Sequence, residues 1–219
     1  MRTLQFTTTH VAQRHSVYKR TLDSFTKHFK GIDFSKSTIY INIDFAPDLP
    51  QLIDESQKTI EYLEEIFYKV VPNITKEANF TKAIEWCWTQ PDEELFFHLE
   101  DDWILEQNVH IDDLLKYFDN DKIFAANLRA YSFRGPRACL LPSVYRNSFC
   151  KDFIKTLKYH RNPERQLREY VANTELKNVH HPEDIHEIIL KDIGRHWLLT
   201  NGLKRNNISN SFIKYSKGQ

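Results

Sequence analysis

The stretch LFFHLEDDW, residues 95–103, is the feature of this sequence that decides the fold. An apolar run of strand length, expected to be a buried strand over residues 94–99, ends abruptly in Glu100, Asp101 and Asp102. Unpaired charges at the edge of a core are costly, and Mg²⁺ or Mn²⁺, held by one or two carboxylates and substrate phosphates, would pair them. Open α/β sheets bind ligands beyond the carboxyl ends of their strands, where these acids are expected. A solvated loop or a helix N-cap is the alternative interpretation.

The composition fits one large domain with a substantial core: 219 residues, of which 41% are hydrophobic. Lys+Arg and Asp+Glu balance at 30 each, so the sequence has no global basic field, and we expect no dedicated nucleic-acid binding. The three cysteines are too few and too widely spaced for a disulfide framework or a zinc motif. We see no signal peptide and no run long enough to span a membrane, which predicts a cytoplasmic protein.

Strand and helix patterns alternate through the first half of the chain, which predicts βαβ units and a parallel sheet. Ser16 is the expected N-cap of the first helix, and Gly31 its expected stop. Residues 201–219 are polar and rich in turn-forming residues, which predicts a flexible tail or a lid. We expect strands at residues 4–9, 37–44, 94–99, 122–128 and 138–142, and helices at 16–29, 49–70, 80–88, 109–118, 146–160, 163–173 and 182–190.

Three segments together resemble glycosyltransferases of the GT-A fold. Residues 7–25 combine a Thr-rich strand end, Arg14 and the helix HSVYKRTLDSF, which is similar to the opening strand and helix of that family. Residues 79–83, NFTKA, resemble its N-x-G-x-A segment, although Thr81 stands where many members have glycine. The acids of LEDDW resemble its D-x-D motif in the E-D-D form of inverting N-acetylglucosaminyltransferases. The resemblance covers most of residues 1–150, and the small size suggests a viral or bacterial member, in host cytoplasm if viral.

The resemblance implies an α/β fold of GT-A type: a Rossmann-like, mostly parallel sheet flanked by helices, with a more helical acceptor-side half. Residues 1–219 would form one domain, with a nucleotide-sugar-binding half over residues 1–126 and an acceptor half over residues 127–219. The implied reaction is metal-dependent transfer of a sugar from a UDP-sugar to a glycan or other hydroxyl acceptor, with inversion by direct displacement.

The resemblance also implies roles for the donor-side residues. Asp102 would bind Mn²⁺ or Mg²⁺, and Asp101 would contact the ribose or the sugar. If the strand continued, alternation would instead put Glu100 on the same side as Asp102, facing the ribose or metal-bound waters, and Asp101 on the other side. Thr8, Arg14 and Asp44 would contact the nucleotide, with Asp44 at the base. The alternative for Thr8 and Asp44 is that they are ordinary strand-end turn residues.

An inverting enzyme needs a general base, and the sequence offers two candidates. Glu164 lies in the first turn of an expected helix, where the family places such an acid, although acids favour helix N-termini in any case. Asp184 is the rival, in the segment HHPEDIH of residues 180–186. That segment is also rich in metal-binding side chains, but its spacing matches no zinc pattern, and Pro182 with acids behind it is typical of a helix start.

The segment DIGRHW, residues 192–197, is unusual in a chain with five glycines. Gly194 would let the backbone approach a ligand closely, and Arg195 would pair with a diphosphate. The resemblance implies that His196 would be a further metal ligand, as a late histidine is in some retaining members of the family. The alternative is a helix C-terminus capped by glycine and followed by a basic residue.

Two other functions stay open on the sequence alone. A nucleotidyltransferase also combines an α/β sheet with a carboxylate-bound cation, but residues 9–16 lack the glycine-rich loop expected of one. A nucleotide-sugar-binding module without turnover would keep the fold, and the intact acid triplet argues against it.

Overall fold

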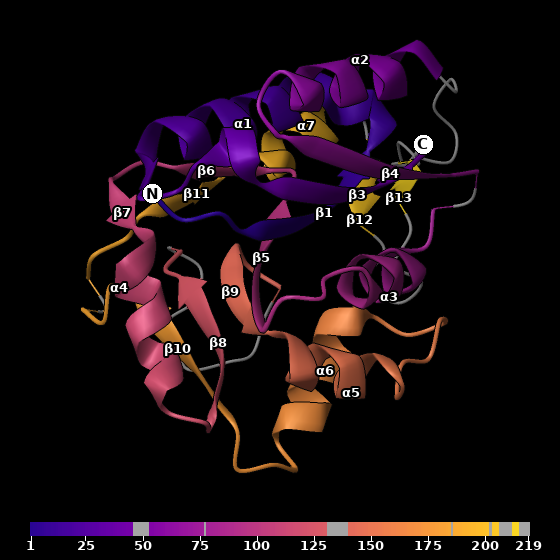
Figure 1. Ribbon diagram of the computed structural model, residues 1–219. Coiled ribbons are helices and arrows are strands. Elements are labelled where there is room, and N and C mark those ends of the chain that lie inside the picture. The colour runs from indigo at the N-terminus through magenta and orange to yellow at the C-terminus, as the bar shows by residue number, and fades with distance from the viewer. Residues whose placement is uncertain are drawn as a thin grey trace.

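A seven-stranded, mostly parallel sheet forms the centre of the protein (Figure 1). The computed structural model describes residues 1–45, 53–76, 78–130, 140–184, 186–201, 203–205 and 212–214. The strand order is β10-β8-β9-β5-β1-β3-β4, and β9 runs antiparallel to both of its neighbours. The strands of this sheet are β1 (Gln5–Val11), β3 (Thr38–Asp44), β4 (Lys69–Thr75), β5 (Leu95–Glu100), β8 (Ile123–Leu128), β9 (Ser143–Arg146) and β10 (Lys177–His181).

Helices flank this sheet, and three short strand pairs lie beside it. The helices are α1 (His15–His28), α2 (Ile53–Glu64), α3 (Phe80–Thr89), α4 (Ile111–Leu115), α5 (Asn147–Ile154), α6 (Pro163–Val171) and α7 (Gly194–Thr200). The pairs are β2 (Phe29–Lys30) with β7 (Val109–His110), β6 (Trp103–Leu105) with β11 (Leu190–Asp192), and β12 (Leu203–Arg205) with β13 (Phe212–Lys214). Among the described residues, no helix combines the length and apolar character needed to cross a bilayer.

Two hydrophobic clusters pack against the sheet, and the alternation of β5 feeds both. Phe97 lies in the larger cluster with Phe25 of α1, whereas its neighbour Phe96 lies in the second cluster with Trp88 of α3 and Phe153 of α5. Successive side chains of a strand point to opposite faces, so a buried strand without polar interruptions can serve both clusters. The run before the acids is therefore a central strand, as the sequence predicts, and it fixes the acids at the carboxyl edge of the sheet.

The expected helix over residues 49–70 is wrong at its C-terminal end. Helix α2 ends at Glu64, and Lys69–Thr75 form strand β4. Pro72 lies within that strand, and this is tolerated because β4 pairs with β3 alone and its other side is a sheet edge.

The region around residue 140 also differs from the expectation. Residues 140–142 are not a strand, and Ser143–Arg146 form β9, where the sequence predicted the helix to begin at residue 146. The helix begins at Asn147 instead. Residues 138 and 139 of the expected strand and most of the expected tail lie outside the described residues.

Three expected helix termini are also corrected. Pro182 does not open a helix: Lys177–His181 are strand β10, turns follow, and Leu190–Asp192 form β11 in the described part of that segment. Gly194 is the first residue of α7 rather than a cap at a helix end. Helix α1 begins at His15, directly after a 3-10 turn, so Ser16 lies within its first turn and is not the N-cap.

Candidate functional site

The acid triplet lies where three neighbouring strands end. Strand β1 is paired with β5 on one side and with β3 on the other, and Val11 at the end of β1 is in register with Asp44. Strand β5 stops at Glu100, so Asp101 and Asp102 form the turn before β6. Strand β11 returns to pair with β6 and leads α7 to the same place (Figure 1).

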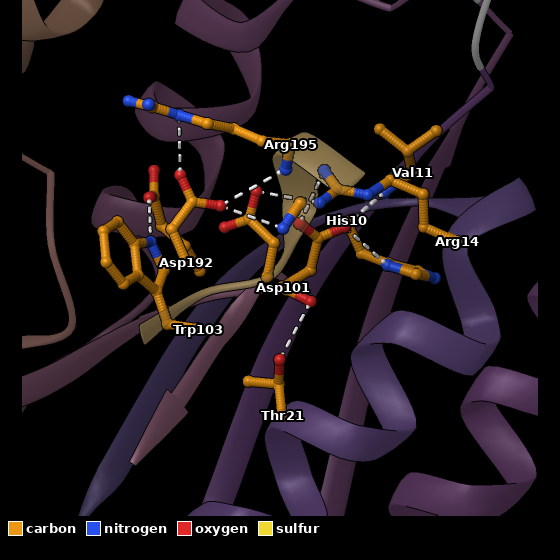
Figure 2. Close-up of polar contacts among 11 residues, drawn as sticks. His10, Val11, Arg14, Thr21, Asp101, Trp103, Asp192 and Arg195 are labelled. Carbon is orange, nitrogen blue, oxygen red and sulfur yellow. Dashed lines mark hydrogen bonds and ion pairs between the residues drawn. The ribbon is translucent and has the colours of Figure 1, made fainter. Parts of the chain in front are cut away.

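Asp101 is a buried carboxylate with a full set of partners (Figure 2). Its Oδ2 lies 3.0 Å from Nδ1 of His10 and accepts from the backbone N–H of Val11 at 3.2 Å, and its Oδ1 lies 3.0 Å from Nη1 of Arg14. The hydroxyl of Thr21 in α1 donates to its carbonyl oxygen at 3.1 Å. Burial alone would raise the pKa of Asp101, but Arg14 and the hydrogen bond from His10 hold it below the usual range, so the group stays ionised.

Arg14 bridges the two aspartates. Its Nη2 donates to Oδ2 of Asp102 at 2.8 Å, while Nη1 pairs with Asp101. The residue is 5% exposed, and its guanidinium lies 5.3 Å from the centre of the Trp197 ring. Burial works against the charged form, but the two carboxylates outweigh it, and the pKa of Arg14 is raised. Its Nε has no hydrogen-bond partner among the described residues.

Asp102 is the more accessible of the pair, with 24% of its side chain exposed. Its pKa is raised, because burial and the charge of Asp101 outweigh the favourable contact with Arg14. Its carbonyl oxygen accepts from the backbone N–H of Ile193 at 2.9 Å, which ties the β6 turn to the segment before α7. A metal site with one protein carboxylate fits this residue, because Mg²⁺ and Mn²⁺ commonly complete their shells with water and substrate phosphates.

Gly194 explains how α7 comes so close to the acids. A Cβ at this position would lie 2.1 Å from Oδ2 of Asp102 and 2.5 Å from Nη2 of Arg14. No side chain fits in that space, so the glycine lets the backbone approach closely, as the sequence suggested. The partners of this close approach are an aspartate and an arginine of the protein itself.

Glu100 does not behave as strand alternation predicts. Its Oε2 accepts from the indole N–H of Trp103 at 3.0 Å, whereas Asp101 and Asp102 both converge on Arg14. The alternation argument fails because the strand stops at Glu100 and the next two residues form a turn.

A cavity of about 490 Å³ lies at the ends of β3 and β4 and the start of α3, and Glu100, Asp101 and Asp102 are not among its lining residues. Asp44 lines it, and its Oδ1 accepts from Nδ2 of Asn42 at 2.8 Å and from the hydroxyl of Thr75. Burial raises the pKa of Asp44 in spite of these hydrogen bonds. Other lining residues are Asn73, Lys76, Asn79, Lys82, Trp86 and Tyr159. A wall of carboxylate and amide groups beside two aromatic rings suits a flat heterocycle with N–H donors.

Sequence reasoning did not identify most of this cavity. Asn42 and Asn73 are register partners on β3 and β4, and Nδ2 of Asn73 donates to Oδ1 of Asn42 at 2.7 Å. An expected helix through residue 70 leaves no strand to pair with β3, so the sequence does not predict this contact. Asn79 begins the segment that resembles the N-x-G-x-A segment of GT-A glycosyltransferases. It caps α3 by accepting from the N–H of Lys82 at 3.1 Å. Trp86 packs against the second hydrophobic cluster and also lines the cavity.

The remaining candidates are spread over the molecule. Thr8 is fully buried within β1, and its carbonyl oxygen accepts from the thiol of Cys87. Arg195 and His196 are exposed residues of α7, and Nε of Arg195 lies 3.2 Å from Asp192. Both residues directly follow Gly194, which packs against Asp102.

The two candidate bases lie in different surroundings. Glu164 is in α6, which packs on α3, and it pairs with Arg168 at 3.8 Å. Asp184 follows β10, whose carboxyl end lies at the same sheet edge as the acids, and its Oδ1 accepts from the N–H of His186 at 2.8 Å. Among the described residues, no group of three or more His, Cys, Asp or Glu side chains is arranged to hold a metal ion, which includes the described part of residues 180–186.

No protein-family model and no curated protein sequence matches the chain. Its fold is similar to those of solved glycosyltransferases. The structure of S. aureus TarS 1–349 in complex with UDP superposes with a TM-score of 0.59 at 10% identity, and covers 87% of this chain and 60% of that one. The mannosyltransferase PcManGT from Pyrobaculum calidifontis, in complex with GDP-Man and Mn²⁺, gives a TM-score of 0.62 at 7% identity, over 83% of this chain and 55% of that one.

TarS 1–349 in complex with UDP-GlcNAc gives a TM-score of 0.57 at 8% identity, over 85% of this chain and 57% of that one. This chain thus spans about 60% of the length of the TarS fragment bound to UDP. The expected GT-A type of α/β fold is confirmed.

Proposed function

We propose that the protein is a metal-dependent glycosyltransferase that moves a sugar from a nucleotide-sugar, a UDP-sugar by preference, to an acceptor hydroxyl. The observation that carries the proposal is that the acid pair after β5 and the cavity at Asp44 after β3 flank the end of the same strand, β1. Two strand spacings, about 10 Å, separate β3 from β5, which suits a nucleoside at one site and a diphosphate at the other. The shared fold with nucleotide-sugar glycosyltransferases supports this assignment.

The cavity is the proposed site for the base. Asp44 accepts from Asn42 and Thr75 through Oδ1 and from the backbone N–H of Asn79, and a carboxylate has a lone pair left for an N–H of the base. Uracil offers such a donor. Complexes of TarS with UDP and UDP-GlcNAc support the uridine donor, whereas PcManGT was solved with GDP-Man.

Asp102 is the proposed ligand of Mn²⁺ or Mg²⁺, with Glu100, two residues earlier, and His196, two residues after Gly194 in α7, as candidates for a further contact. When bound, such a cation would stabilise the negative charge that develops on the departing diphosphate. Asp101, paired with His10 and Arg14, fixes the turn that presents Asp102. Arg14 and Arg195 supply positive charge for phosphate oxygens.

We propose Asp184, rather than Glu164, as the general base. Nε of Arg129 donates to the carbonyl oxygen of Pro182 at 2.7 Å and Nη2 donates to that of Glu183 at 3.2 Å, so the backbone before Asp184 is held in place. Asp184 itself is exposed and lies on the side of the sheet that residues 127–219 build, which we assign to the acceptor. Direct attack of the deprotonated hydroxyl would invert the sugar.

A panel of nucleotide-sugars tests the proposal. Each donor is incubated with the protein and Mn²⁺, and release of the nucleoside diphosphate is measured with wild type and Asp102→Asn. Release from at least one donor that depends on Mn²⁺ and falls by about two orders of magnitude in the variant supports the proposal. If nucleotides bind but none of the donors turns over with any simple glycan or water, a binding module is the better description.

A further inference from the structure

The guanidinium of Arg14 lies at Asp101 and Asp102, where a metal cation would otherwise be expected. Its two Nη atoms lie 3.0 Å from Asp101 and 2.8 Å from Asp102, so one guanidinium neutralises both carboxylates. This bridge is buried, since Arg14 is 5% exposed. At the same time, Nε of Arg14 is buried without a hydrogen-bond partner among the described residues. The guanidinium therefore does not make all of its possible hydrogen bonds with the described residues.

Helix α7 closes over this bridge. The backbone at Gly194 packs so tightly that an added Cβ would lie within 2.5 Å of Nη2 of Arg14, and the ring of Trp197 covers the guanidinium at 5.3 Å. The backbone N–H of Ile193 donates to the carbonyl oxygen of Asp102 at 2.9 Å. Arg14 and the backbone of α7 thus lie against Oδ2 of Asp102, while 24% of the Asp102 side chain stays exposed.

We propose that Arg14 is a built-in counter-cation that competes with the divalent metal for Asp102 and transfers to the diphosphate when the nucleotide binds. The proposal rests on the proposed function for the identity of the nucleotide, whereas the competition itself concerns residues of this chain alone. Arg14 pairs with Asp102 in the protein without nucleotide and with the diphosphate once the nucleotide is bound.

The chemistry of the groups explains the exchange. A guanidinium and a divalent cation at the same oxygen repel each other, so binding of one must weaken binding of the other. Phosphate oxygens accept two parallel hydrogen bonds from arginine and would satisfy Arg14 when it leaves Asp102. Metal binding alone is therefore weak, and metal and diphosphate strengthen each other's binding by the same factor.

Binding of Mn²⁺ alone, with no nucleotide present, tests the competition. Free Mn²⁺ is followed by electron paramagnetic resonance in titrations of wild type, Arg14→Gln and Arg20→Gln. Arg20 is an exposed residue of α1, so its variant removes the same charge without touching the acids. Arg14→Gln is expected to bind Mn²⁺ at least about tenfold more tightly than wild type, and Arg20→Gln to match wild type. Equal or weaker binding by Arg14→Gln overturns the proposal.

Arg14→Lys keeps the charge and protects the experiment against a folding defect of Arg14→Gln. A lysine cannot bridge both carboxylates with a planar fork, so this variant is expected to bind Mn²⁺ with an affinity between those of wild type and Arg14→Gln. An affinity of Arg14→Lys at or below that of wild type contradicts the competition. A parallel titration of UDP into wild type reports on the proposed function separately, so loss of nucleotide binding with intact competition identifies the donor assignment as the fault.

Discussion

Gly194 is the point at which α7 meets the acid pair, and Gly194→Ala tests that contact. The added Cβ would lie 2.1 Å from Oδ2 of Asp102. An ordinary carbon–oxygen contact is about 3.3 Å, so α7 or the aspartate must retreat by about 1.2 Å. Overpacking of this kind typically destabilises a protein by about 1–3 kcal/mol. For a chain of this size, 2 kcal/mol corresponds to about 4–8 °C in melting temperature.

Thermal unfolding followed by circular dichroism measures the effect. Leu199→Ala is the matched control, because Leu199 lies on the same helix with 67% of its surface exposed, and we expect it to change stability by less than about 0.5 kcal/mol. The double variant Gly194→Ala/Asp102→Ala should lose less than the sum of the two single variants, because removal of the carboxylate relieves part of the clash. If Gly194→Ala melts at the wild-type temperature, α7 does not pack on the acids as described.

Three further predictions concern single side chains. Burial raises the pKa of Asp44, so its ionisation at neutral pH opposes folding; Asp44→Asn should gain stability relative to wild type as the pH rises from 4 to 7, and should weaken UDP binding. Burial lowers the pKa of His98 to about 3, so the folded state loses stability as the pH falls below about 6.5, by up to about 1.4 kcal/mol per pH unit; His98→Gln should flatten this dependence in urea unfolding. Asp184→Asn should lower kcat by about two to four orders of magnitude, whereas Glu164→Gln should leave it within a few-fold of wild type.

Each of these has its own contradicting result. For Asp44, a difference in unfolding free energy from wild type that is constant between pH 4 and 7 would show that the carboxyl is not perturbed. For His98, unchanged acid sensitivity in the variant would place the responsible group elsewhere. For the base, a large loss of kcat in Glu164→Gln with full activity in Asp184→Asn would reverse the assignment.

Local patterns in the sequence were enough to predict the carboxyl edge of the sheet. The apolar run of β5 and the acids that follow it, the Ile-rich strand ending in Asp44, and the amphipathic helix after β1 are all encoded within short windows. Where a local signal was ambiguous, the prediction failed. Lys69–Thr75 carry a proline and exposed polar residues, and they form a strand because they pair with β3 at an edge.

The contacts that define the site could not be read from the sequence. Gly194 and Asp102 are far apart in the chain, and they meet because β11 pairs with β6. Arg14 was expected to contact a nucleotide. Its ion pairs with Asp101 and Asp102 join residues far apart in the chain, so no local pattern predicts them. The short antiparallel β9 between β5 and β8 was missed because four residues carry too little periodicity to separate a strand from the start of the next helix.

The most direct test of the donor site is a calorimetric titration of UDP into wild type, Asp102→Ala and Asp121→Ala, with Mn²⁺ and then with a chelator. Asp121 is an exposed acid, and its variant controls for the loss of one negative charge. The proposed function predicts Mn²⁺-dependent binding to wild type and Asp121→Ala that is lost with chelator and in Asp102→Ala. The absence of nucleotide binding to wild type, or binding to Asp102→Ala that equals wild type, would contradict the assignment of this site.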